Sequence, residues 1–399
     1  MKSGEGLTLD ALRKTFVRKG QGPVQAVNGI DLIVREGELL GLLGPSGCGK
    51  STTLRMIAGL EEPTSGDIRI RGRSIVGRPS HLRDVAVAFE NYALYPPLTV
   101  AENIAFGLKA RKEPDAAARA QEVAERLGLT PILDRKPGGL SSGQKQRVSL
   151  ARAIVRRPSV LLLDEPLSHL DAAERDQTRR ELKRLQRETG YTTVLVTHDQ
   201  QEALSLADRV AVMDGGEFKQ IGTPDQVYDA PDNLFVADFV GEPRMNLLPG
   251  RLTMDGASLT VILSPEVRVV LPGRLASRGD GDRAVTLGIR PQDITVGGRE
   301  EPGVVPATVF AFEPLQEVGR LTVTLAGVAT RVVIETDHHF FARPEDPLGL
   351  RFDPRRTHLF DTENGGRLAW QIDPASAPES APAPTPSPRR PSSPATVLS

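Results

Sequence analysis

Eight consecutive residues have the types and spacing that bind phosphate groups: Gly44, Pro45, Ser46, Gly47, Cys48, Gly49, Lys50 and Ser51. They follow a strand predicted at 39–43 and precede an apolar helix predicted from Thr52 to Leu60. Glycines let the backbone curl so that N–H groups face phosphate oxygens, and the helix N-terminus adds the positive end of its dipole. Lys50 would neutralise phosphate charge, and the Ser51 hydroxyl would ligate Mg²⁺. The spacing predicts a nucleotide-binding loop that includes Thr52.

Acidic and imidazole side chains follow two further apolar runs. Asp164 and Glu165 end a strand predicted at 160–163, and His198 follows a strand predicted at 193–196. Adjacent carboxylates at a strand end could be surface charges or a helix cap. The phosphate loop upstream disfavours both of these alternatives and favours a place for the two acids beside the bound phosphates.

Cys48 lies within the phosphate loop, and it is the only cysteine of the chain. We expect its backbone rather than its thiol to matter, because a small residue fits there. Redox sensitivity is the alternative, since a helix N-terminus lowers the pKa of a thiol. A single cysteine excludes an internal disulfide.

Length and charge limit the classes of function. At 399 residues the chain exceeds what one hydrophobic core usually supports, so two domains are expected. The 50 basic and 51 acidic residues leave a net charge of −1, which does not favour DNA or RNA as a partner. With no signal-peptide core and no run of about 18 apolar residues, we expect a cytosolic chain that meets a membrane only through a partner.

Hydrophobic periodicity predicts an α/β core at 1–238. Apolar runs bounded by turn residues are typical of strands buried on both faces of a parallel sheet. The stretch 172–189 has helical spacing and stops at Gly190, a favoured residue after a helix. Between about 97 and 157 the strand signal disappears and segments such as 116–127 favour helix, which predicts a helical insert.

The character of the sequence changes again after the predicted core. Short strands are expected at 258–263, 284–289, 320–325 and 330–334, broken by Gly and Pro, which favours a small all-β barrel at 239–373. Residues 374–399 are rich in Pro, Ser and Ala, too poor in apolar groups to offset their ordering entropy, so a disordered tail is expected.

The segment Leu140-Ser141-Ser142-Gly143-Gln144-Lys145-Gln146-Arg147, read with the phosphate loop and the acidic pair, resembles the signature loop of ATP-binding-cassette (ABC) ATPases. In that family the loop closes over the ATP held by a second copy, so the resemblance implies a homodimer, or a pairing with a similar ATPase. It implies catalytic roles for Lys50, Glu165 and His198, and ATP contacts from Ser141, Ser142, Gly143 and Gln144. Asp164 would hold Mg²⁺, Glu165 would polarise the attacking water and His198 would contact the γ-phosphate.

Other positions match the family less uniformly. Phe16 matches the aromatic residue on which adenine stacks, whereas a core position is the alternative. Arg135 and Lys136, before the signature loop, could approach the opposite nucleotide or be solvated.

Three positions depart from the family pattern. Glu90 stands where the family usually has a glutamine that senses Mg²⁺ and water, so Glu90 is expected among the nucleotide and metal contacts. Ser142 replaces a glycine and suits a helix N-terminus if its φ is negative. His169, in a loop that resembles the one crossing to the partner, replaces a more usual asparagine.

The resemblance narrows toward ATPase subunits of binding-protein-dependent sugar and glycerol-phosphate importers. It is carried by the segments 92–96, 134–137, 239–246, 288–291 and 352–354. It implies an OB-like regulatory and dimerisation domain, two transmembrane permease subunits, an extracytoplasmic solute-binding protein and a position on the cytoplasmic face of the membrane. Two chains would close head to tail around two Mg-ATP. Import of polyamines, iron or sulfate is the main alternative, and a weakly hydrolysing regulatory module is another.

Overall fold

The computed structural model describes residues 4–17, 20, 22–255, 258–275 and 282–372. Its contacts divide the chain into two compact units, Met1–Val227 and Tyr228–Ser399. The predicted tail at 374–399 lies outside the described residues. Within those residues, no helix combines the length and apolar character needed to span a bilayer.

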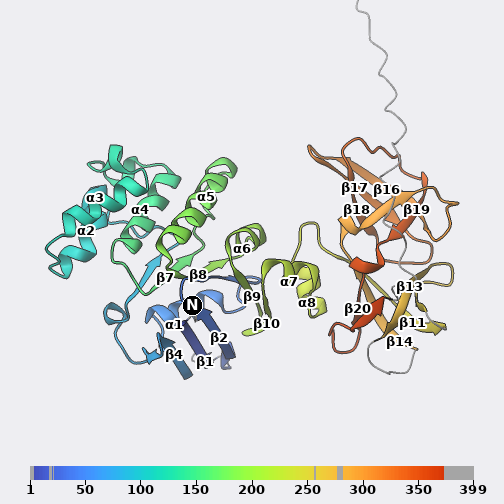
Figure 1. Cartoon of the computed structure of the whole chain (residues 1–399), viewed down its shortest axis with the longest axis horizontal. Helices are drawn as coiled ribbons and strands as arrows, with labels where there is room; N and C mark the ends of the chain where they lie inside the picture. Colours follow the sequence, from blue (N-terminus) through green and yellow to red (C-terminus); the bar gives the residue numbers. More distant parts are fainter. Residues whose placement is uncertain (1–3, 18–19, 21, 256–257, 276–281, 373–399) are drawn as a thin grey trace, which may run out of the picture. The chain divides into compact units, whose positions relative to one another are not determined.

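The first unit contains a six-stranded, mainly parallel sheet and a four-stranded antiparallel sheet (Figure 1). The larger sheet has the order β10-β9-β3-β8-β7-β6 and is parallel except for its β10 edge. Its strands are β3 (Leu39–Leu43), β6 (Val85–Ala88), β7 (Val160–Asp164), β8 (Thr192–Thr197), β9 (Arg209–Asp214) and β10 (Glu217–Gly222). The smaller antiparallel sheet, in the order β2-β1-β4-β5, comprises β1 (Glu5–Phe16), β2 (Val24–Arg35), β4 (Ser65–Ile70) and β5 (Arg73–Ser74).

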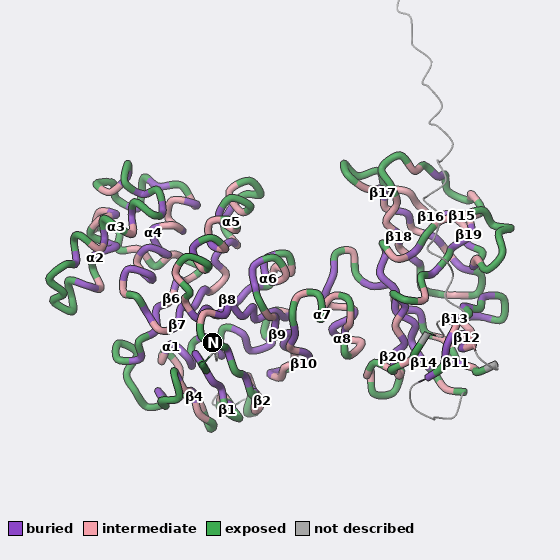
Figure 2. Tube along the Cα trace, in the orientation of Figure 1, coloured by how far each residue is buried: buried purple, intermediate pink, exposed green. Residues whose placement is uncertain are grey.

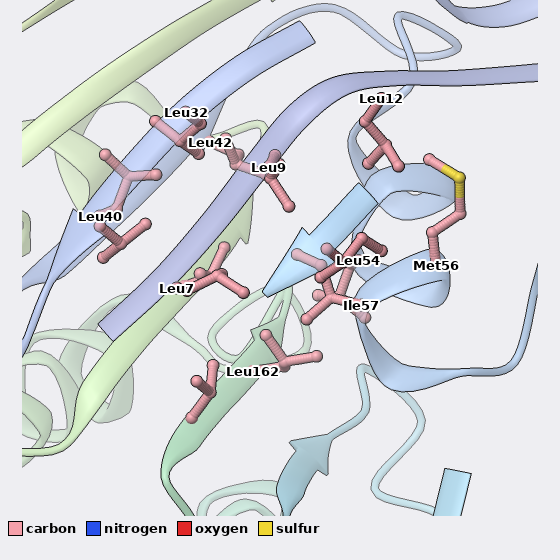
Figure 3. Packing of buried hydrophobic residues seen from close by; sticks show 14 of the residues in the cluster. Leu7, Leu9, Leu12, Leu32, Leu40, Leu42, Leu54, Met56, Ile57 and Leu162 are labelled. Carbon is pink, nitrogen blue, oxygen red and sulfur yellow. The ribbon is translucent and has the colours of Figure 1, made fainter. Parts of the chain in front are cut away.

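Apolar side chains from both sheets meet around the first helix, α1 (Lys50–Ala58) (Figure 3). Leu54 and Ile57 of α1 are fully buried in one cluster with Leu162 of β7 and Leu9 of β1. Burying a leucine or isoleucine side chain contributes about 1.5–3 kcal/mol. This shared core fixes α1, and therefore its N-terminus, against both sheets.

Helices complete the first unit. The predicted insert contains α2 (Val100–Ala110), α3 (Ala116–Arg126) and α4 (Ser142–Ile154), which contact one another and group together in Figure 1. Along the chain, α5 (Ala172–Thr189) connects β7 to β8, and α6 (Gln200–Leu206) connects β8 to β9. Helix α5 has the predicted bounds, and Gly190 follows it in the left-handed conformation at φ 63°.

The second unit is an all-β structure with short helices at its start, α7 (Pro224–Asp229), which spans the division, and α8 (Leu234–Phe239). One sheet has the order β20-β14-β11-β12-β13-β21 and the other β15-β19-β16-β17-β18. Their apolar faces form one buried cluster, seen as purple segments in Figure 2. The strands are β11 (Asn246–Asp255), β12 (Ser258–Ile262), β13 (Arg268–Leu275), β14 (Arg283–Ile289), β15 (Ile294–Gly297), β16 (Val305–Pro314), β17 (Val318–Thr324), β18 (Val332–Asp337), β19 (Pro347–Phe352), β20 (His358–Asp361) and β21 (Trp370–Ile372).

A buried arginine contacts the segment that precedes the predicted boundary at 238/239, a segment that belongs to the second compact unit. Arg290 is 1% exposed, and its guanidinium donates to the carbonyls of Tyr228, at 2.8 Å, and Val240. The guanidinium also lies 4.1 Å from the centre of the Tyr228 ring. A Cβ at Gly241, where φ is 119°, would lie 2.4 Å from the guanidinium. Arg290 therefore ties the segment 228–241 to the β unit.

Replacing Arg290 by Met should destabilise the β unit, because the buried carbonyl of Val240 and the part-buried carbonyl of Tyr228 lose their donor. Each unsatisfied group costs about 1–3 kcal/mol, so we expect the free energy of unfolding of this unit to fall by about 2–6 kcal/mol. Trp370, the only tryptophan, lies in β21 and reports this transition by fluorescence during urea unfolding. Arg355→Met, at an exposed position, should leave the midpoint within experimental error. Equal midpoints for both variants would contradict the anchoring role of Arg290.

Candidate functional site

The phosphate loop connects β3 to α1 and is closely packed on its inner side. A Cβ at Gly44 would lie 2.2 Å from the carbonyl oxygen of Met213, in β9. A Cβ at Gly49, where φ is 113°, would lie 2.4 Å from the carbonyl oxygen of Ala26, in β2. Only glycine fits at these two positions, which explains two of the glycines singled out in the sequence.

The N-terminus of α1 lacks a side-chain cap, since Gly49 occupies the N-cap position. The first N–H groups of a helix have no partner within it, and here they are available to an anion. Lys50 begins the helix and is 6% exposed, with its Nζ donating to the carbonyls of Gly44 at 2.7 Å and Pro45 at 3.0 Å. Glycine backbone, helix terminus and ammonium group together fit a phosphate ligand.

Cys48 is 4% exposed, and its Sγ lies 3.7 Å from the Nζ of Lys50. Burial raises the pKa of the thiol above its usual range, although the charge of Lys50 acts in the opposite direction. A raised pKa disfavours the reactive thiolate. The structure therefore supports packing, not redox sensitivity, as the role of Cys48.

Four groups that sequence analysis singled out lie along one edge of the parallel sheet. The phosphate loop follows β3, and His198 follows β8. Asp164 ends β7 and Glu165 comes directly after it, while Glu90 follows β6. The strand order β3-β8-β7-β6 places them side by side in that same order. Parallel strands present their carboxyl ends at one edge, where ligands of open α/β sheets bind.

Glu165 is held in a strained backbone conformation beside His198. Its φ of 47° is unusual for a residue with a side chain and is maintained by neighbouring bonds. Its N–H donates to the carbonyl of Val196 at 2.8 Å, and its own carbonyl accepts from the Ser168 hydroxyl at 2.7 Å. The carboxylate Oε2 lies 2.8 Å from Nδ1 of His198. The two side chains proposed to act on the γ-phosphate are thus in direct contact.

Asp164 lies among like charges. Burial raises the pKa of its carboxyl group, and the charges of Glu165 and Glu90 raise it further, against smaller effects of Arg55 and Lys50. A divalent cation would relieve this repulsion, and carboxylate and hydroxyl oxygens are the ligands that Mg²⁺ prefers. The donor set of Asp164 and the Ser51 hydroxyl therefore fits Mg²⁺.

Glu90 contacts a residue that sequence analysis did not pair with it. Its Oε1 lies 3.5 Å from Nε2 of His169, and both side chains are about half exposed. The ring of His169 meets the ring of Tyr92 edge to face at 6.1 Å between centroids. Two of the three positions that depart from the family pattern are therefore neighbours.

The signature segment opens α4 as a capped helix. Ser141 is the N-cap, and its hydroxyl accepts from the N–H of Gln144 while the Gln144 side chain accepts from the N–H of Ser141. Ser142 is the first helical residue and is not among the residues with positive φ, so a serine fits there. A Cβ at Gly143 would lie 3.2 Å from a carboxylate oxygen of Glu174. The signature segment therefore packs against Glu174 of α5.

Three further residues singled out in the sequence, Phe16, Arg135 and Lys136, lie in other segments of the chain. Phe16 ends β1 in the antiparallel sheet and is half-buried, and the Nζ of Lys14 lies 4.9 Å from its ring centroid. Arg135 is exposed and donates to the carbonyl of Gly139, and Lys136 is also exposed. Phe16 thus lies on the antiparallel sheet, whereas Arg135 and Lys136 lie between α3 and α4.

Sequence analysis missed the network that supports His198. Glu202, in α6, is 2% exposed and accepts from the hydroxyl of Thr197 at 2.7 Å. The same hydroxyl accepts from the N–H of Asp199, and the Asp199 side chain caps α6. An acidic residue directly before a helix is the sequence signal that indicates the Asp199 cap. The burial of Glu202 depends on packing that no local pattern reveals.

Comparison with protein families finds three matches along the chain. Residues 27–168 match the family described as ABC transporter, residues 241–294 match the MalK OB fold domain, and residues 287–360 match the TOBE domain. These matches confirm the expected ATPase core and β-rich second part, in which a TOBE domain accompanies the OB fold.

Several import ATP-binding proteins match most of this chain at more than 40% sequence identity. A xylose/arabinose import ATP-binding protein of Haloferax volcanii is 44% identical and covers 91% of this chain and 95% of its own length. A trehalose/maltose import ATP-binding protein of Thermococcus litoralis is 45% identical, covering 89% and 98%. An sn-glycerol-3-phosphate import ATP-binding protein of Cereibacter sphaeroides is 43% identical, covering 88% and 98%.

Solved structures resemble the first part of the chain. A dimeric ATP-binding cassette in a post-hydrolysis state, bound to ADP and Pi, aligns with a TM-score of 0.50 at 30% identity. It covers 55% of this chain and 98% of its own. A second dimeric structure, of a bacterial ABC transporter cassette, aligns equally well.

The buried Glu202 should make the stability of the first unit depend on pH. Burial raises the pKa of its carboxyl group from 4.5 to about 7. The folded state therefore keeps a proton that the unfolded state releases, and stability should fall as pH rises from about 4.5 to about 7, by at most about 3 kcal/mol. Glu202→Gln removes this dependence, so the variant should gain stability relative to the parent at pH 8 but not at pH 4.

Urea unfolding followed by circular dichroism at both pH values measures the effect. Glu62→Gln makes the same chemical change at an exposed position and should behave like the parent at each pH. A stability difference between Glu202→Gln and the parent that is the same at pH 4 and pH 8 would show that Glu202 keeps an ordinary pKa.

Proposed function

Because this chain belongs to the ABC transporter family, we propose that it is the ATP-hydrolysing subunit of an importer for a sugar or sugar-like solute. Its relatives named above are import ATP-binding proteins for pentoses, disaccharides and glycerol phosphate. Their names favour this class of solute over polyamines, iron or sulfate. The membrane partners, rather than this chain, would select the solute.

One observation carries the enzymatic part of the proposal. An uncapped helix N-terminus with a buried lysine shares a sheet edge with a carboxylate, Glu165, that contacts an imidazole, His198. The loop 44–51 and Thr52 would hold the phosphates of ATP by backbone N–H groups and by Lys50. Glu165 would orient and polarise the attacking water, and His198 would contact the γ-phosphate and hold the Glu165 side chain in place.

Mg²⁺ would be bound by Ser51 and Asp164, and when bound it supplies charge neutralisation to the phosphates. The residues of this chain contribute positioning and electrostatics, the main sources of catalysis in phosphoryl transfer. Phe16 would stack on adenine from the end of β1.

The partners follow from the signature segment and the relatives. We propose that two copies pair head to tail, so that Ser141, Ser142, Gly143 and Gln144 of one copy close over the ATP of the other. Two permease subunits would receive the movement, with an extracytoplasmic binding protein delivering the solute to them. The chain would then lie at the cytoplasmic face of the membrane.

Glu165→Gln should lower ATP turnover by at least about 100-fold, because the amide cannot act as a base toward water. ATP affinity should remain close to that of the parent, since the phosphate loop is unchanged. Phosphate release measures turnover, and equilibrium binding of a fluorescent ATP analogue measures affinity.

Two further variants make this result specific. Lys50→Ala should lose binding and turnover together, whereas Glu62→Gln, at an exposed site, should change neither. Turnover of Glu165→Gln above about a tenth of the parent value would assign the base to another residue.

The composite site predicts complementation between two inactive variants. Lys50→Ala disables the phosphate loop, and Ser141→Arg places a bulky side chain in the signature segment. In a head-to-tail pair formed from one copy of each, one site has both variants and the other has neither. An equal mixture that exchanges subunits should therefore recover up to about a quarter of the parent ATPase activity.

The controls are each variant alone at the same total concentration, and each should be inactive. A mixture of either inactive variant with the exposed-site variant Glu62→Gln gives the ATPase activity that remains when active copies are diluted by inactive ones. This activity is the upper limit with which the mixture of the two inactive variants is compared. A mixture of the two inactive variants without recovered activity, despite demonstrated exchange, would mean that each chain completes its own site.

A further inference from the structure

Two acid–imidazole pairs flank Asp164 at the sheet edge. One is Glu165 with His198, at 2.8 Å, and the other is Glu90 with His169, at 3.5 Å. In the second pair the acid belongs to the segment after β6 and the imidazole to the loop after β7. The contact therefore joins two loops that are 79 positions apart in the sequence and that both border the nucleotide site.

The surroundings of the second pair hold both partners in place. Tyr92, whose ring packs edge to face on His169, and Ala93 both have positive φ, at 62° and 47°, so the segment turns sharply after Glu90. The carbonyl of Ala93 accepts a hydrogen bond from Arg152 of α4. Tyr92 thus packs against the imidazole, while Arg152 of α4 secures the turn that follows Glu90.

The charge of Glu90 needs a partner at this position. It adds a third carboxylate to the pair Asp164 and Glu165, and its charge acts on Asp164 in the same direction as that of Glu165. ATP phosphates would add further negative charge to the same edge. An unpaired Glu90 would repel them, whereas a carboxylate in contact with an imidazole, at 3.5 Å, presents less charge to the ligand.

We propose that His169 is a positioning residue for Glu90. The imidazole holds the carboxylate against the loop after β7 and keeps its charge away from the bound phosphates and from the ligands of Mg²⁺. Glu90 and His169 therefore act as a matched pair, and Asp164 is left as the carboxylate for the metal. This assignment replaces the expectation that Glu90 itself ligates Mg²⁺, and it rests on the proposed nucleotide site.

A double-mutant cycle tests the pairing. The variants are His169→Asn, Glu90→Gln and the two substitutions combined, and the readout is equilibrium affinity for a fluorescent, non-hydrolysable ATP analogue with Mg²⁺. In the parent, His169→Asn should weaken binding at least about threefold, because Glu90 loses its partner. In the Glu90→Gln background, the same substitution should change affinity less than about 1.5-fold. The second substitution thus rescues the first, which general damage to the loop would not allow.

His81→Asn is the matched control, since it makes the same chemical change at an exposed histidine in the same unit. It should change affinity in neither background. An effect of His169→Asn that is equal in both backgrounds, including no effect in either, overturns the inference.

The same measurements separate this inference from the proposed function. If Lys50→Ala binds the analogue as well as the parent does, the nucleotide site is wrongly placed and the proposed function fails. If Lys50→Ala abolishes binding but His169→Asn acts equally in both backgrounds, only the pairing of Glu90 with His169 fails.

Discussion

The whole site depends on a steric constraint, the absence of space for side chains on the inner side of the phosphate loop. Gly44 faces a carbonyl of β9 and Gly49 faces a carbonyl of β2, and these strands belong to different sheets. The loop is therefore shaped by both sheets at once, which explains why a small antiparallel sheet packs against the ATPase core. The apolar cluster beneath α1 holds the sheets together, so core packing and anion binding depend on each other.

The order of the strands in the parallel sheet places the residues of the site next to one another. Because β3, β8, β7 and β6 run parallel, their carboxyl ends bring the loop, His198, the acidic pair and Glu90 to one edge. These strands are largely buried, and the charged residues of the site come at their ends or just after them. The functional groups come from four distant parts of the sequence, yet no long side chain has to reach across the sheet.

Sequence patterns predicted the parts of this structure that depend on local chemistry. The phosphate loop, the strands that precede the acids and His198, and α5 with its terminal Gly190 all follow from residue types and spacing. The antiparallel sheet was not anticipated, although 30–35 in β2 alternates between buried and exposed residues. The contact of Glu90 with His169 and the burial of Glu202 arise from tertiary packing, which leaves no local pattern to read.

The resting position of Lys50 has a consequence for which ligands the loop accepts. Its ammonium group already donates to two carbonyl oxygens of its own loop, at 2.7 and 3.0 Å, and is almost fully buried. An incoming anion must replace those acceptors as well as shed its own water. Chloride offers one acceptor atom and a single carboxylate two, whereas a polyphosphate chain supplies several charged oxygens at once. The loop therefore screens its ligands by an exchange of hydrogen bonds, before any contact with the base or sugar is made.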